Sequence, residues 1–103
     1  MHPQVTFRGL FPSESMVQEV WRRAGALHAC RPEISGCHVR IERVSPRKRS
    51  KYRVMVSLSA ADELSGHSDA ITCDDVSTGL HEAFTEARRM FLVAPPLGAA
   101  GGN

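Results

Sequence analysis

Apolar residues recur at every second position through the middle of this chain, and this alternation constrains the fold more than any other feature. It runs through residues 35–44 and again through residues 52–58, and a short polar connection that contains Pro46 joins the two segments. A period of two is typical of strands that bury one face. Two such strands joined by a short polar connection predict an antiparallel β-hairpin.

The alternation assigns the side chains of the hairpin to two faces. The apolar face carries Cys37, Val39, Ile41, Tyr52, Val54, Val56 and Leu58. An N-terminal strand shows the same pattern, because Val5 and Phe7 alternate with Thr6 and Arg8. We therefore expect an open, polar sheet face that carries Thr6, Arg8, His38, Arg40, Arg53, Met55 and Ser57.

Apolar residues at helical spacing predict an amphipathic helix from about Ser13 to His28. Ser13 is a favourable N-cap, and Glu14 places a negative charge at the positive end of the helix dipole. The helix is expected to end at Arg31-Pro32, because the residue before a proline avoids the helical conformation. The stripe expected to face the core consists of Met16, Val17, Val20, Trp21, Ala24 and Leu27.

A second amphipathic helix is predicted near the other end of the chain, before Pro95-Pro96. Either Asp74 or Asp75 can cap its N-terminus. Gly79 lies in its interior, where glycine costs about 1 kcal/mol relative to alanine, so we expect another part of the chain to pack closely there. Its apolar stripe consists of Val76, Leu80, Ala83, Phe84, Ala87 and Phe91.

The elements follow one another as strand, helix, strand, strand, strand and helix, with a weak strand candidate at residues 67–72. This order predicts an α+β fold, β-α-β-β-β-α, with one mostly antiparallel four-stranded sheet and both helices packed on one face. A chain of 103 residues has room for a single domain. We assign residues 1–93 to it and residues 94–103 to a flexible tail rich in Gly, Ala and Pro.

The net charge of +2 hides an uneven distribution of charge. Residues 40–53 hold seven basic residues and one acidic residue, a local charge of +6, whereas the rest of the chain carries −4. A local field of this strength attracts polyanions such as nucleic acids. The candidate phosphate-binding residues in this segment are Arg40, Arg47, Lys48, Arg49, Lys51 and Arg53. With one Trp and one Tyr in the chain, we expect shape and backbone recognition rather than base readout.

The sequence argues against several other classes of protein. No run approaches the roughly 18 apolar residues of a membrane span, and the N-terminus lacks the apolar region of a secretory signal. Three cysteines are odd in number and too few for a disulfide scaffold. We therefore expect a cytoplasmic protein with reduced thiols and no membrane partner.

The candidate catalytic and metal-ligating residues form no recognised pattern. A zinc site would have to use His28, Cys30, Cys37 and His38. Their spacing does not match the ligand spacing of known zinc sites. In addition, Cys37 and His38 are expected on opposite faces of a strand. Cys73 at a helix start is a nucleophile in principle, but more simply a small apolar filler. We expect no enzymatic activity, no metal, no cofactor and no small-molecule substrate.

Several short motifs carry a resemblance to a known family. They are CHVRIE at residues 37–42, DV at 75–76 with LHEAF at 80–84, and PRKR at 46–49 before YRV at 52–54. In order and spacing they resemble the short, single-domain form of the ribosome hibernation-promoting factor and ribosome-associated translation inhibitor family, also called sigma-54 modulation proteins. The resemblance extends from about Val5 to Phe91.

This resemblance implies a sheet backed by two helices and binding to 16S rRNA in the decoding region of the small ribosomal subunit. A protein bound there excludes tRNA and mRNA and holds ribosomes idle. By position, Arg23 and Arg89 match basic helix residues that the family turns toward 16S rRNA. The expected function is thus a non-catalytic, ribosome-associated regulator, present as a monomer or weak homodimer, whose partners are the small subunit and its rRNA.

An alternative hypothesis belongs to a different class of protein. Three further positions that are commonly basic in the family hold Ala26, Glu86 and Val93, and residues 94–96 replace its basic extension. These differences favour a protein-interaction or self-association module on the same fold. The basic hairpin connection would then be a solvated loop, and the arginines near the helix ends would serve the helix dipoles.

The role of the hairpin connection is testable by mutation. Changing Arg47, Lys48 and Arg49 together to alanine should weaken rRNA binding, because fewer phosphates are neutralised and fewer counterions are released. The slope of log K against log salt concentration should flatten for the same reason. Binding titrations at several salt concentrations measure both quantities. Unchanged affinity and slope would remove the connection from the binding mechanism.

Overall fold

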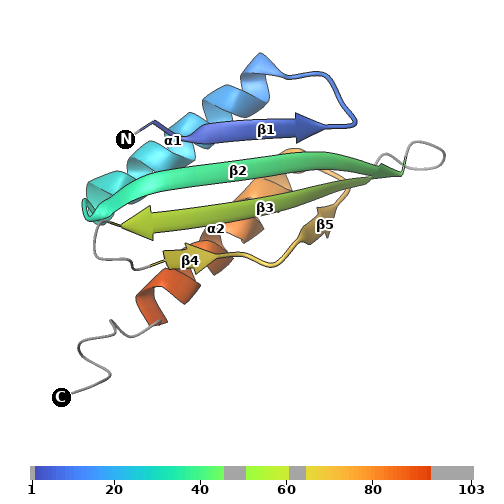
Figure 1. Cartoon of the computed structure of the whole chain (residues 1–103). Coiled ribbons are helices and arrows are strands. Elements are labelled where there is room, and N and C mark those ends of the chain that lie inside the picture. The colour runs from blue at the N-terminus through green and yellow to red at the C-terminus, as the bar shows by residue number, and fades with distance from the viewer. Residues whose placement is uncertain (1, 46–50, 61–64, 94–103) are drawn as a thin grey trace.

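The computed structural model of the chain describes residues 2–45, 51–60 and 65–93. Its elements in chain order are β1 (Gln4–Arg8), α1 (Glu14–Cys30), β2 (Ile34–Ser45), β3 (Lys51–Ala60), β4 (Ser65–His67), β5 (Ile71–Cys73) and α2 (Val76–Val93) (Figure 1). The predicted hairpin connection at 46–50 and the predicted tail at 94–103 lie outside the described residues.

The sheet is built around the long β2–β3 hairpin, as the alternation predicts. The two strands pair antiparallel from Ile34 opposite Ala60 to Ser45 opposite Lys51. β1 pairs with β2 in parallel, and β4 and β5 both pair antiparallel with β3. β1 is parallel because α1 carries the chain back along the sheet, which is the crossover that a parallel pair needs. The α+β order and the mostly antiparallel sheet are therefore confirmed, and the sheet as a whole is mixed.

The fourth strand differs from the prediction, because two short strands occupy the place of a single strand at residues 67–72. Ser68 lies between them and forms hydrogen bonds with the backbone of β3. Its hydroxyl accepts a hydrogen bond from the Val56 N–H (3.0 Å), and its own N–H donates to the Val56 carbonyl (2.9 Å). A side-chain oxygen thus replaces a backbone acceptor, and Ser68 is 2% exposed. The ladder with β3 is interrupted there and resumes at Ile71.

Both helices cover the same face of the sheet, and this face is the apolar one (Figure 1). The hairpin side chains predicted to face the core are buried, except that Tyr52 is partly buried, while His38 and Ser57 on the other face are exposed. Residues that are fully buried come from helices and strands alike and include Val20, Ala24, Val39, Ile41, Val54, Val56, Leu80 and Ala83. One core therefore positions both helices against the hairpin.

The predicted N-caps of both helices are present. The Ser13 hydroxyl accepts a hydrogen bond from the Met16 N–H (3.4 Å). At the start of α2 the cap is Asp75, whose carboxylate accepts hydrogen bonds from the Thr78 N–H (3.1 Å) and the Thr78 hydroxyl (2.9 Å). Each cap satisfies a backbone donor that the helix itself leaves free.

Trp21 does not belong to the core, contrary to the prediction. Its side chain is 46% exposed, and its ring lies 5.5 Å from the ring of His2. The buried residues of α1 are Val20, Ala24 and Leu27, which form one narrow stripe. Trp21 is rotated about 100° around the helix from its neighbour Val20. It therefore falls outside the stripe that faces the sheet.

Two glycines allow α2 to approach the sheet closely. A Cβ atom added at Gly79 would collide with the Cys73 sulfur, which confirms the expected close packing at this position. A Cβ atom added at Gly66 would lie 2.5 Å from the Ala87 carbonyl oxygen and 2.6 Å from the Phe91 nitrogen. These two atoms belong to the main chain of α2, so they cannot give way as a flexible side chain would.

Alanine at Gly66 should destabilise the protein by about 1–3 kcal/mol, because α2 would have to move away from β4. Gly25→Ala is the matched control: nothing lies within 4 Å of a Cβ added there, inside α1. That control should raise the free energy of unfolding by up to about 1 kcal/mol through helix propensity. Urea denaturation of the two variants measures both changes. A Gly66→Ala variant as stable as the native chain would contradict the close approach.

Candidate nucleic-acid interface

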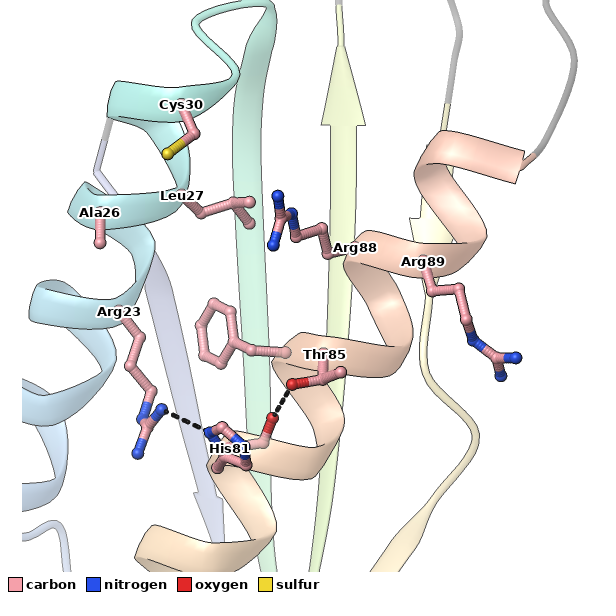
Figure 2. A pocket seen from close by; sticks show the side chains of 9 residues that line it. Arg23, Ala26, Leu27, Cys30, His81, Thr85, Arg88 and Arg89 are labelled. Carbon is pink, nitrogen blue, oxygen red and sulfur yellow. Dashed lines mark hydrogen bonds between the residues drawn. The ribbon is translucent and has the colours of Figure 1, made fainter.

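A groove with a volume of about 510 Å³ lies between α1 and α2, and we call it the interhelical groove (Figure 2). Leu27 and Phe84 supply apolar lining, and Arg23, Arg88 and Arg89 are its basic residues. Arg23 belongs to α1, and the other two arginines belong to α2. Two rigid helices therefore bring guanidinium groups from distant parts of the sequence to one surface.

The two neighbouring arginines of α2 take different directions. In Figure 2 the Arg88 side chain points toward α1 across the groove, whereas Arg89 points to the opposite side of α2. There Arg89 lines a second hollow together with Glu82 and Glu86. The resemblance singled out Arg89, and Arg88 was not among the predicted site residues. Helical spacing is the signal that finds it, because Arg88 follows His81 by seven residues and so shares its face.

Arg23 has a counter-charge on its own helix. Its Nη2 and Nε atoms lie 2.9 and 3.0 Å from Oε2 of Glu19, one turn earlier. Its Nη1 atom lies 3.4 Å from Nδ1 of His81 on α2. A guanidinium has no acceptor, so in this contact Nδ1 of His81 accepts. His81 is exposed, and Arg23 of the other helix is its hydrogen-bond partner.

Glu19 connects the two helices. Besides binding Arg23, its carboxylate accepts a hydrogen bond from the Ser77 hydroxyl at the start of α2 (2.7 Å). Burial raises the pKa of the Glu19 carboxyl, but the hydrogen bonds from Ser77 and Arg23 and the nearby charges outweigh it, and the net pKa is lowered. The carboxylate is therefore stabilised in its charged form. As a result, part of the positive charge of Arg23 is already compensated.

The predicted site residues of the hairpin lie on the other face of the sheet. Arg40 and Arg53 are partly buried on this open sheet face, which carries the residues expected there. In the register of the strands, Arg53 lies opposite Glu42, and Glu42 lies beside Arg8 of β1. The structure therefore places Arg23 and Arg89 on the helix layer and Arg40 and Arg53 on the open sheet face, so the two groups form two surfaces.

Three of the predicted basic residues cannot be placed in this way, because Arg47, Lys48 and Arg49 lie outside the described residues. Lys51 is described, and it is exposed at the first position of β3. The phosphate-binding role assigned to this part of the chain stays a prediction.

The cysteines occupy three different environments. Burial raises the pKa of the Cys37 thiol to about 11, so this group stays protonated near neutral pH. Burial first, and then the charges of Asp75 and Glu82, raise the pKa of the Cys73 thiol. Cys73 therefore lacks the lowered pKa that a nucleophile at a helix start would have. Cys30 is exposed and lines the interhelical groove.

The residues considered for a zinc site point in different directions. Cys37 is buried in the core and His38 is exposed on the other face, as their alternation predicts. His28 donates from Nδ1 to the Ile34 carbonyl (2.9 Å). Over residues 2–45, 51–60 and 65–93, no three His, Cys, Asp or Glu side chains come close enough to hold a metal ion together. In the same ranges, no helix has the length and apolar character needed to cross a membrane.

The comparisons with known proteins concern the whole fold. No protein-family model matches the chain, and no curated protein sequence does. Among solved structures, the chain is similar to a ribosomal subunit interface protein from Coxiella burnetii, with a TM-score of 0.65. The two chains share a fold. The match covers 87% of this chain and 93% of the other at 17% sequence identity, so it speaks for architecture alone.

The Glu19 interactions should make stability depend on pH. Because the pKa of Glu19 is lowered from its ordinary value of 4.5, its contribution is present above pH 4.5 and is lost as the pH falls through the folded-state pKa. We expect Glu19→Gln to lower the free energy of unfolding at pH 7 by about 0.5–1 kcal/mol. The difference from the native chain should shrink below pH 4.5.

Urea denaturation from pH 3 to 8 measures this effect. Glu33→Gln serves as the control, because it removes the exposed Arg31–Glu33 ion pair within a short stretch of chain. Such a pair contributes little to stability, so this variant should differ from the native chain by only a few tenths of a kcal/mol. A Glu19→Gln difference that stayed constant with pH would argue against the ionised carboxylate as the link between the helices.

Proposed function

We propose that this protein is a non-catalytic, ribosome-associated regulator in the cytoplasm and a member of the hibernation-promoting and translation-inhibitor family. In this proposal it binds 16S rRNA in the decoding region of the small subunit and inhibits translation or holds ribosomes in hibernation. The observation that carries the proposal is the interhelical groove, in which Arg23 and Arg88 from separate helices face a common surface. The fold shared with a ribosomal subunit interface protein supports it.

The chemistry of the groove suits a structured RNA. Guanidinium groups bind phosphate oxygens through two parallel hydrogen bonds, and their flat faces stack on exposed bases. Both helices are fixed by the core, so the spacing of Arg23 and Arg88 is set before binding. A rigid, basic surface of this kind recognises the backbone and shape of a folded RNA rather than its sequence. Such a role requires binding alone and no catalytic group.

A second candidate function is a protein-interaction or self-association module, and one feature of the groove favours it. Ala26 lines the groove at a position where the family is commonly basic. Together with the counter-charge on Arg23, this residue makes the groove less positive than the resemblance implies. Glu86 lies in the other hollow, beside Arg89, and accepts a hydrogen bond from the Asp69 N–H (2.7 Å). An apolar-lined groove of reduced charge also suits a protein partner or a second copy of the chain.

Co-sedimentation with ribosomes and with separated 30S subunits, at low and near-physiological salt, tests the first candidate. We expect the protein to pellet with 30S subunits at both salt concentrations. Arg23→Gln and Arg88→Gln should each weaken binding roughly tenfold by removing a charged hydrogen bond. Each should also reduce the salt slope by about 0.7–0.9 for the phosphate that is no longer neutralised.

Arg22→Gln is the matched control for these variants. Arg22 is exposed beside Arg23 on α1 but does not line the groove, so the variant removes the same charge from a different surface. It should bind within about twofold of the native chain. A native protein that stays in the supernatant at both salt concentrations would contradict the ribosome proposal. Concentration-dependent light scattering that is insensitive to salt and to RNA would then support the interaction module.

A further inference from the structure

One edge of the sheet is open along a whole strand (Figure 1). β1 pairs with β2 on one side, and within residues 2–45, 51–60 and 65–93 no strand pairs with its other side. Its five residues run in continuous register with β2 and include no proline, lysine or bulge, three devices that commonly block a sheet edge. The outer N–H and C=O groups of β1 are therefore available to a further strand.

The opposite edge of the sheet offers less to a partner. It consists of β4 and β5, which have three residues each and are separated by the hydrogen bonds of Ser68 to β3. Among the strands that the structure describes, β1 is thus the edge strand with the longest uninterrupted run. The fold limits one edge and leaves the other open.

Apolar side chains lie partly exposed along β1. Val5 and Phe7 are on the helix-covered face of the sheet but are only half-buried. Val39 and Ile41, which lie beside them on β2, are fully buried. The difference arises because β2 has a neighbouring strand on both sides, whereas β1 has one on a single side. A strand added to this edge would cover the apolar surface that Val5 and Phe7 leave exposed.

Trp21 lies on the flank of α1 that faces this edge. It is two residues from both Glu19 and Arg23, which contact α2, so it is on the opposite side of the helix. Because α2 lies over β3, β4 and β5, the side away from α2 is the side of β1. The Trp21 ring also lies 5.5 Å from the ring of His2, two residues before β1. Trp is among the side chains most enriched at the energetic centres of protein interfaces.

We propose that β1 pairs with β1 of a second copy of the chain, antiparallel and about a two-fold axis perpendicular to the sheet. Such an axis joins two five-stranded sheets into one and keeps both helix layers on the same side. It also brings Trp21 of each copy beside the partner's turn at Gly9, because His2 and Gly9 lie at opposite ends of β1. Each copy uses its open edge once, so the association is closed and stops at a dimer.

The side chains of β1 are complementary to themselves in this arrangement. The register that pairs all five residues places Thr6 opposite Thr6 at the axis, Val5 opposite Phe7, and Gln4 opposite Arg8. A β-branched residue then meets an aromatic residue twice on the helix side of the sheet, which is a stabilising pair of neighbours. Arg8 is the one charged side chain of β1, and it meets a neutral amide rather than a second cation. The sequence of the strand therefore fits a second copy of itself.

This inference does not depend on the proposed function. The interhelical groove lies on the flank of α1 that faces α2, so it stays free in the dimer. The β1 edge and the groove also share no residue. Self-association through β1 is thus distinct from self-association through the groove, and variants of the two surfaces separate them.

Sedimentation equilibrium of the purified chain, without RNA, measures the association directly. We expect a monomer–dimer equilibrium between about 1 μM and 1 mM, because the junction consists of one short strand and one ring from each copy. Trp21→Ala should weaken the dimer at least about fivefold. Met90→Ala is the matched control, since it shortens another exposed apolar side chain, 44% exposed on α2, and should leave the association unchanged.

Two substitutions at one position test the register. Gln4→Glu places a carboxylate opposite the partner's Arg8 and should tighten the dimer, whereas Gln4→Lys places a second cation there and should weaken it. The pair occurs twice about the axis, so each shift should be roughly 2- to 30-fold in Kd. In an Arg8→Gln background both shifts should largely disappear. Within one chain the two residues are about 13 Å apart along the strand, so this pattern requires two copies.

The possible outcomes decide the proposal. A native chain that stays monomeric up to about 1 mM would refute it and would leave the edge to an extended segment of a different protein. Shifts of equal sign for Gln4→Glu and Gln4→Lys would contradict the antiparallel pairing of β1. A dimer that Arg88→Gln abolishes and the Gln4 variants leave unchanged would place self-association in the groove instead. None of these results depends on pelleting with 30S subunits, so the two proposals fail separately.

Discussion

The burial of one face of the β2–β3 hairpin is the interaction on which the rest of the structure depends. Its fully buried aliphatic side chains each contribute about 1.5–3 kcal/mol, and both helices lie on them. Because strand side chains alternate, the same burial fixes which residues face solvent on the other side. Arg40 and Arg53 therefore cannot join Arg23 in one surface. The separation of two basic surfaces is a consequence of core packing and not of charge.

The hairpin, both helices and their caps could be predicted because each depends on local periodicity or on one capping side chain. The features that could not be predicted depend on distant partners. The split of the fourth strand follows from Ser68 bonding to Val56, twelve residues away. The contact between Arg23 and His81 joins residues 58 positions apart. Trp21 was wrongly assigned to the core because the sequence does not show where the apolar stripe of a helix ends. Packing against the sheet defines that limit.

The candidate site was predicted in part. Arg23 lies in the interhelical groove as a basic helix residue should, but its partner across the groove is Arg88, since Arg89 points to the other side of α2. One residue along a helix corresponds to a rotation of about 100°. Matching a position to the family therefore identifies which segment is basic more securely than it identifies the direction of a side chain. Glu19 contributes an effect that no sequence motif shows: it positions the Arg23 side chain and at the same time compensates part of its positive charge.

The parallel pairing of β1 has a consequence for the order in which the molecule assembles. The β2–β3 hairpin closes a short loop, and α2 follows soon after it along the chain. β1 reaches its place beside β2 only after the whole segment of residues 9–33 has been closed into a crossover, which costs more chain entropy. We therefore expect β1 to dock late in folding and to detach early in local unfolding. The turn at Gly9, which directly follows β1, would then be released together with that strand.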